Sequence, residues 1–173
     1  RGPDDFWSNI GLSEIEIYGE ESDIEAAENK NHVNAAGVTA EASTTEASSL
    51  PVSNIKDGNN QTRWASDYSE ASKQTVTVTF PKVTLVKELD FDLHTRDVAP
   101  MPSNVKSFDL VYADAAGTEH TVKISNAKST ESGKTGYVTN VQHIFETPVY
   151  MKSFKMTNFD LQIDIEGQNG YNN

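Results

Sequence analysis

The chain has 173 residues, of which 36% are hydrophobic, and 26 acidic residues against 14 basic ones give a net charge of −12. This length allows one domain of about 140 residues with an appendage, and the lack of clustered Lys and Arg excludes nucleic-acid binding through phosphates and disfavours anionic membrane surfaces. The absence of cysteine excludes disulfides and thiol chemistry, and no apolar run is long enough for insertion into a membrane.

The first strand pattern lies near the start of the chain. Residues 10–18 alternate in a way that is typical of a strand: one parity holds Leu12, Glu14 and Glu16, and the other holds Ser13, Ile15 and Ile17. The acidic stretch 20–36 has no apolar face wide enough to pack as a helix, so we expect a linker there.

The remainder reads as further strands separated by short turns. In residues 74–80, for example, Val and Phe alternate with Thr, and Pro81 is expected to end that strand. The pattern predicts an all-β chain folded as an antiparallel β-sandwich. The other expected strands are 37–43, 83–95, 105–113, 119–124, 137–145 and 149–158.

A polar stretch, residues 54–64, interrupts this pattern with the dipeptide Asp57-Gly58. Gly tolerates a positive φ and Asp binds its own backbone, so the dipeptide predicts a tight turn that aims carbonyls inward. The Asp57 carboxylate and the Thr62 hydroxyl would add oxygens to that hollow, and oxygens are the ligands of Ca²⁺. The spacing alone favours a polar loop without an ion, and it is not that of an EF-hand.

A resemblance to a known family lies in this stretch, which reads Ser53-Asn54-Ile55-Lys56-Asp57-Gly58-Asn59 and then Thr62-Arg63-Trp64. The run resembles the signature of the coagulation factor V/VIII C-type (discoidin) domains, whose bacterial relatives are the family 32 carbohydrate-binding modules. Weaker similarity continues to about residue 160. The resemblance implies a β-sandwich jelly roll with a structural Ca²⁺ in this loop and a ligand site among loops at one end.

The order of the strands departs from that family. Residues 13–18 resemble its last strand, and family members continue past the place where this chain stops. A sandwich that lacks its last strand exposes unpaired backbone groups. We therefore predict that strand 10–18, within an N-terminal segment 1–19, fills the final strand position of a domain at 37–173, as in a circular permutation. Alternatively, the strand belongs to a preceding module and pairs with a neighbouring molecule.

The resemblance also implies a set of metal ligands. Two carboxylates facing one divalent cation would balance its charge, and the ion would pin the loop to the last strand. The implied ligands are the carboxylates of Asp57 and Glu14, the Thr62 hydroxyl, and the carbonyls of Ser13, Asn54 and Asn59.

One expected ligand group stands at the end of strand 83–95. In family 32 modules an arginine in this region binds sugar hydroxyls, because its planar fork meets two oxygens; Arg96 matches it, with His94 beside it. The asparagine that follows in those modules is unmatched, since Asn104 comes late, which puts a galactose-type site in doubt. Alternatively, His94 and Arg96 are an exposed pair that interacts with the negative charges of nearby aspartates.

Two tyrosines complete the expected ligand site. Tyr68 and Tyr171 occupy loop positions from which family members stack aromatic rings on sugars. Taken alone, each is better explained as a half-exposed surface tyrosine, and Trp7 could compete with Tyr171 for the same place.

The sequence thus predicts a non-catalytic carbohydrate-binding module of a multimodular bacterial protein, a glycoside hydrolase, that is secreted or attached to the cell surface. Its partners would be glycans of galactose or N-acetylhexosamine type and neighbouring modules. No catalytic site is expected. Asp164 and Glu166 are spaced like a general acid/base pair, but such pairs arise by chance in a chain this acidic, and the histidines lack metal-ligand spacing. The alternatives are a structural spacer or a protein-adhesion module of the same fold.

Overall fold

The computed structural model describes residues 9–21, 30–31, 36–67, 69–94, 103–129 and 138–163. In these ranges it contains strands and two short 3₁₀ helices, η2 (Val52–Lys56) and η3 (Ala71–Lys73). None of the helices found there has the length and apolar character needed to cross a bilayer. The strands are β1 (Gly11–Glu21), β2 (Lys30–Asn31), β3 (Thr39–Ala42), β4 (Trp64–Ala65), β5 (Val76–His94), β6 (Ser103–Ala113), β7 (Glu119–Ser125) and β8 (Val138–Ile163).

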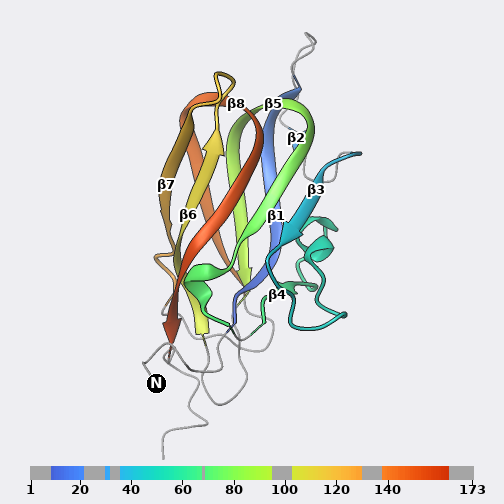
Figure 1. Ribbon diagram of the computed structural model, residues 1–173, viewed down its shortest axis with the longest axis vertical. Helices are drawn as coiled ribbons and strands as arrows, with labels where there is room; N and C mark the ends of the chain where they lie inside the picture. Colours follow the sequence, from blue (N-terminus) through green and yellow to red (C-terminus); the bar gives the residue numbers. More distant parts are fainter. Residues whose placement is uncertain are drawn as a thin grey trace, which may run out of the picture.

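The two longest strands, β5 and β8, form a bent antiparallel ribbon that belongs to both layers of the sandwich. They pair from Val76 opposite Met156 to His94 opposite Val138, with register shifts between Thr79 and Thr84 and between Val86 and Glu88. Both strands turn over at the upper end in Figure 1 and return on the other side of the core. One half of the ribbon pairs with β3 and β6, with β7 on the far side of β6, and the other half pairs with β1.

Every strand pair is antiparallel, and the hydrogen-bonded order is β2-β1-β5-β8-β6-β7, with β3 on β5 and β4 on β1. The predicted all-β sandwich is confirmed. The expectation that Pro81 ends a strand is wrong, because β5 continues past it through the bend. Pro81 lies between Thr79 and Thr84, where no residue of β5 pairs with β8, so its missing N–H breaks no bond of that ladder.

The core joins the two layers through aromatic rings. Phe91 of β5 meets Phe108 of β6 edge to face at 5.1 Å, and it meets Phe154 of β8 at 6.5 Å. All three side chains are at most 1% exposed. Such pairs add about 0.5–1.5 kcal/mol each beyond the burial of their area, so they hold the layers face to face.

Strand β1 is part of this core. It pairs with β5 from Leu12 opposite Leu93 to Glu21 opposite Thr84, and Ile15 and Ile17 are fully buried. The prediction that strand 10–18 pairs within its own chain is therefore confirmed. The segment expected as a linker contains the end of β1 and all of β2, which pairs with β1; residues 22–29 and 32–35 lie outside the described ranges.

Candidate functional site

The turn predicted at Asp57-Gly58 is present and follows directly from η2. The helix is anchored by Ile55, which is fully buried, and Gly58 has a φ of 75°. The Asp57 carboxylate accepts the backbone N–H of Asn59 at 2.8 Å, which closes the turn. Only glycine adopts such a φ without strain, so the dipeptide dictates where the chain reverses.

Three of the expected oxygen ligands converge on this turn. The Thr62 hydroxyl lies 2.7 Å from Oδ2 of Asp57 and 2.8 Å from the carbonyl oxygen of Asn59. On the other side of the loop, the Asn54 amide donates to the Arg63 carbonyl at 2.8 Å. The loop thus gathers a carboxylate, a hydroxyl and a carbonyl in one place.

Strand β1 supplies a second carboxylate to the same turn. Oε2 of Glu14 accepts the backbone N–H of Gly58 at 3.1 Å. Glu14 is 5% exposed, and its other oxygen, Oε1, is buried without a hydrogen-bond partner among the described residues. Ser13 lies at the register shift that turns this part of β1 toward the loop, and it is fully buried.

The electrostatics of Glu14 are those of an anion that lacks a counterion. Burial, followed by the negative charge of Asp57, raises the pKa of its carboxyl from 4.5 to about 7, although the N–H groups of Gly58 and Asn59 act in the opposite direction. A buried carboxylate beside a second carboxylate is costly unless a cation neutralises both.

The donor set of this loop fits a hard cation. The described part of the chain holds no cluster of three or more His, Cys, Asp or Glu residues suited to a metal. An ion at the turn would therefore take two carboxylates and complete its shell with hydroxyl and carbonyl oxygens, which suits Ca²⁺ and not Zn²⁺.

The segments that carry the expected sugar-binding residues are connected to strands that meet at one end of the sandwich. The start of β1, the ends of β4 and β5, the start of β6 and the end of β8 lie together there, because Gly11 pairs with Ala65 and Ser103 with Ile163. This is the lower end in Figure 1. The segments that carry Tyr68, Arg96 and Tyr171 attach at this end, but these three residues lie outside the described ranges.

The two other expected ligand residues are buried. His94 is 5% exposed and Asn104 is 2% exposed, with the Asn104 amide 3.2 Å from the Thr139 hydroxyl. The alternative in which His94 belongs to an exposed pair is therefore wrong. Gly11 lies against the backbone of His94, since a Cβ on that glycine would lie 2.8 Å from the His94 carbonyl oxygen, so only glycine allows β1 to approach this closely.

A buried polar cluster at this end escaped the sequence reasoning. The Asn126 amide donates to the Val105 carbonyl and to Thr139 Oγ1, both at 2.9 Å, and its Oδ1 accepts the N–H of Lys128 at 3.0 Å. Asn126 follows directly after β7 and begins a polar stretch of the sequence. An Asn directly after a strand was the available signal, because its amide can cap neighbouring backbone groups.

Replacing Asn126 with Ala is expected to lower the free energy of unfolding by about 1–3 kcal/mol, because buried hydrogen-bonding groups lose their partner. Denaturant unfolding measures this loss. The matched control is Asn140→Ala, which removes an exposed amide that donates to Asp92 at 2.8 Å and should cost no more than about 0.5 kcal/mol. Equal losses in the two variants would contradict the structural role of the cluster.

Comparison with known proteins connects this fold to sugar-binding modules. A search of curated proteins finds no match. A family 32 carbohydrate-binding module from C. perfringens NanJ, solved with galactose, is 18% identical with a TM-score of 0.53, over 76% of this chain and 91% of that one. The module CpGH89CBM32-4 from Clostridium perfringens, solved with glcNAc-alpha-1,4-galactose, is 20% identical with a TM-score of 0.52, over 88% and 94%.

These two identities show a shared fold. The sequence itself carries the assignment, because the model of the F5/8 type C domain matches residues 39–170, most of the chain, and this stretch contains the turn described above. The predicted resemblance is thereby confirmed, and the chain belongs to the F5/8 type C domain family.

Proposed function

We propose that this chain is a non-catalytic carbohydrate-binding module that holds a structural Ca²⁺. The observation that carries the proposal is the buried Glu14 carboxylate fixed on the Asp57-Gly58 turn, within a fold shared by two modules solved with galactose-containing sugars. Both support the same conclusion, that the scaffold serves to position loops for recognition.

The calcium would act on structure alone. Its ligands would be the groups at the turn, and bound Ca²⁺ supplies two positive charges to two carboxylates. By joining Glu14 of β1 to the loop at Asp57, the ion would fix the end of the sandwich next to β4. The proposed ligands are Glu14, Asp57 and Thr62 through side chains, and Ser13, Asn54 and Asn59 through carbonyls.

The sugar would bind at the lower end, where Arg96 would meet two hydroxyls and Tyr68 or Tyr171 would stack on a ring. We propose a galactose- or N-acetylhexosamine-type ligand. One such module buries few groups and binds weakly, so we further propose that it serves a multimodular extracellular bacterial protein, a glycoside hydrolase, in which several modules act together.

A glycan array followed by titration with galactose and N-acetylgalactosamine tests this function. We expect weak binding that Arg96→Ala abolishes without a change in melting temperature. Lys106→Ala is the control, because it also removes a cation, one that is exposed on β6 and paired with Asp160 at 3.2 Å. Arg96→Ala binding like wild type would contradict the assigned role.

The second candidate is a structural spacer, favoured by one observation: Asn104 is buried against Thr139 and so is not available to a sugar. Absence of binding to every glycan on the array would support the spacer. Capture of a protein partner that free sugars do not displace would support an adhesion module instead.

A further inference from the structure

A hollow lies at the other end of the sandwich, where the β6–β7 turn meets the bend of the β5–β8 ribbon. Its volume is about 230 Å³. The space exists because the residues on the turn side are small: Ala113 ends β6, and a Cβ built on Gly117 would have no atom within 4 Å. On the ribbon side, larger side chains, Val83, Tyr150 and Lys152, border it.

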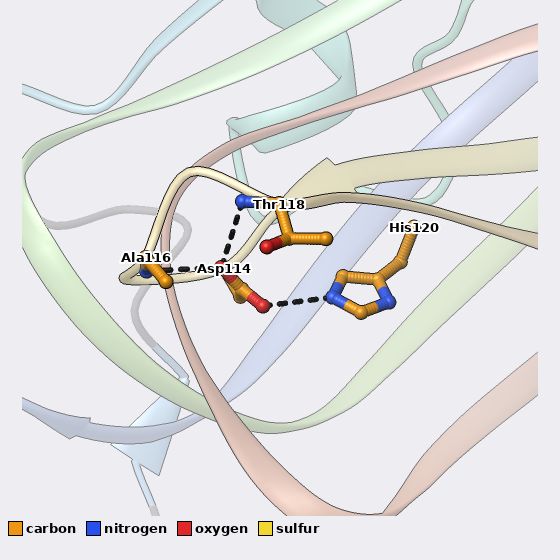
Figure 2. A network of polar contacts seen from close by, with 4 residues as sticks. All are labelled: Asp114, Ala116, Thr118 and His120. Atoms are coloured by element: carbon orange, nitrogen blue, oxygen red, sulfur yellow. Dashed lines mark hydrogen bonds and ion pairs between the residues drawn. The ribbon is translucent and has the colours of Figure 1, made fainter.

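The turn side of the hollow is rigid. Oδ1 of Asp114 accepts the backbone N–H groups of Ala116 and Thr118, both at 2.9 Å, and Oδ2 lies 2.8 Å from Nε2 of His120 (Figure 2). The backbone closes the same turn, since the N–H of Gly117 donates to the Asp114 carbonyl at 2.9 Å. These bonds hold the pKa of Asp114 below its usual value.

The turn is also tied to the core. The His120 ring stacks on Tyr112 at 5.2 Å, and Tyr112 meets Phe145 edge to face at 5.3 Å. A ligand in the hollow would therefore meet a wall that is already ordered, so binding would cost little conformational entropy on this side.

The ribbon side offers apolar surface. Tyr150 is 45% exposed and Val83 is 39% exposed, although most large apolar side chains of the described chain are buried. An exposed tyrosine beside a small hollow can stack on the apolar face of a sugar ring. The volume is below the roughly 300 Å³ at which pockets for drug-sized ligands begin, so the hollow suits one ring.

Two ionisable side chains border the hollow, the carboxylate of Asp114 and the ammonium of Lys152. Both carboxylate oxygens of Asp114 are already bonded, whereas the exposed Lys152 forms no ion pair with any residue that the structure describes. Lys152 offers three N–H donors and a positive charge, and it prefers an anionic acceptor. Ser153 also borders the hollow.

We propose that this hollow is a second carbohydrate subsite that takes a single sugar ring bearing a carboxylate, a hexuronate, with Tyr150 stacked on the ring and Lys152 paired with the carboxylate. This subsite lies apart from the calcium turn and from the loops at the lower end. Its ligand is therefore independent of the sugar proposed for those loops.

Titration of the ¹⁵N-labelled full chain with matched sugars tests the proposal. Galacturonate and glucuronate are compared with galactose and glucose, which lack only the carboxylate, and with acetate, which lacks the ring. We expect amide shifts at Gly117 and Lys152 with one hexuronate, a dissociation constant on the order of 1 mM, and no saturation with acetate. A chain of that hexuronate binding more tightly than the monomer would show that the natural source is a polymer; equal affinity would point to a free or terminal residue.

Two variants probe the contacts. Lys152→Gln should weaken hexuronate binding by about tenfold and leave the neutral sugars unchanged, as expected for the loss of one charge-assisted hydrogen bond. Ala113→Leu, at an exposed position, should fill the hollow and abolish binding. Lys123→Gln is the control, because Lys123 lies on β7 and is paired with Asp109 at 3.5 Å.

The proposal is overturned if neither hexuronate shifts these amides, if acetate saturates them equally, or if Lys152→Gln binds like wild type. Loss of galactose binding in Arg96→Ala with hexuronate shifts intact would show that the two sites are separate. Hexuronate binding without any binding at the lower end would overturn the proposed function and leave this subsite standing.

Discussion

Removing residues 1–21 is expected to leave a chain that does not fold cooperatively. Four fully buried side chains, Ile10, Leu12, Ile15 and Ile17, would be lost from the core. Each contributes about 1.5–3 kcal/mol by burial, which together approaches the 5–15 kcal/mol stability of a typical domain. The second half of β5 would also lose the partner that pairs with it from Thr84 to Leu93.

Circular dichroism and thermal unfolding measure this outcome. The matched control is a chain in which residues 9–21 are moved behind residue 173, the order that the family pattern suggests. Because β1 begins at the end of the sandwich where β8 finishes, this rearranged chain should regain a cooperative transition. A truncated chain that unfolds cooperatively with an intact near-ultraviolet spectrum would show that β1 is dispensable.

At pH 8, the Glu14→Gln variant is expected to be more stable than wild type without calcium and less stable than wild type when calcium is added. The folded state raises the pKa of Glu14 from 4.5 to about 7. The folded state therefore favours protonated Glu14. The stability that this group contributes is fully present below about pH 4.5 and is lost as the pH rises through about 7. Without metal, the neutral glutamine should thus be more stable than wild type at pH 8, with no such advantage at pH 4.

With calcium at pH 8 the order should invert. Wild type would gain stability by mass action, about 2.7 kcal/mol at a concentration one hundred times the dissociation constant, and the variant would gain little. Melting temperatures with calcium and with chelator measure both effects. Glu16→Gln, the next outward position on β1, is the control and should not invert. A wild type that is indifferent to calcium and chelator would refute the metal site.

Asp57→Ala tests the same proposed calcium site by removing its carboxylate ligand on the loop. It should abolish the calcium response, but unlike Glu14→Gln it should also lower the melting temperature without metal. The reason is that Asp57 accepts bonds from the Asn59 N–H and the Thr62 hydroxyl, so its removal opens the turn itself. An unchanged metal-free melting temperature would mean that the turn does not depend on these bonds.

Local chemistry made part of this structure predictable. The Asp57-Gly58 turn is determined by two adjacent residues, and the inward positions of Leu89, Phe91 and Leu93 follow from strand alternation; all three are fully buried. The pairing of β1 within its own chain required the family resemblance, because no local pattern states which edge a strand will join.

The features that could not be predicted from the sequence are those that tertiary packing determines. His94 has the same parity as Asp90 and Asp92 in strand 83–95, which by alternation faces away from Leu89, Phe91 and Leu93, yet it is only 5% exposed. Pro81 reads as a strand terminator, but it falls in a bend where β5 and β8 do not pair. Asn126 looked like loop composition and instead bonds buried groups on two strands. None of these outcomes depends on residues near in sequence.

The shared ribbon of β5 and β8 also governs how this molecule comes apart. In a sandwich whose layers are built from separate strands, one layer can peel from the other with its own ladder intact. Here each layer contains half of the same two strands. Opening either layer therefore strains the ladder that continues into its neighbour, so a pull on one layer is shared with the whole domain.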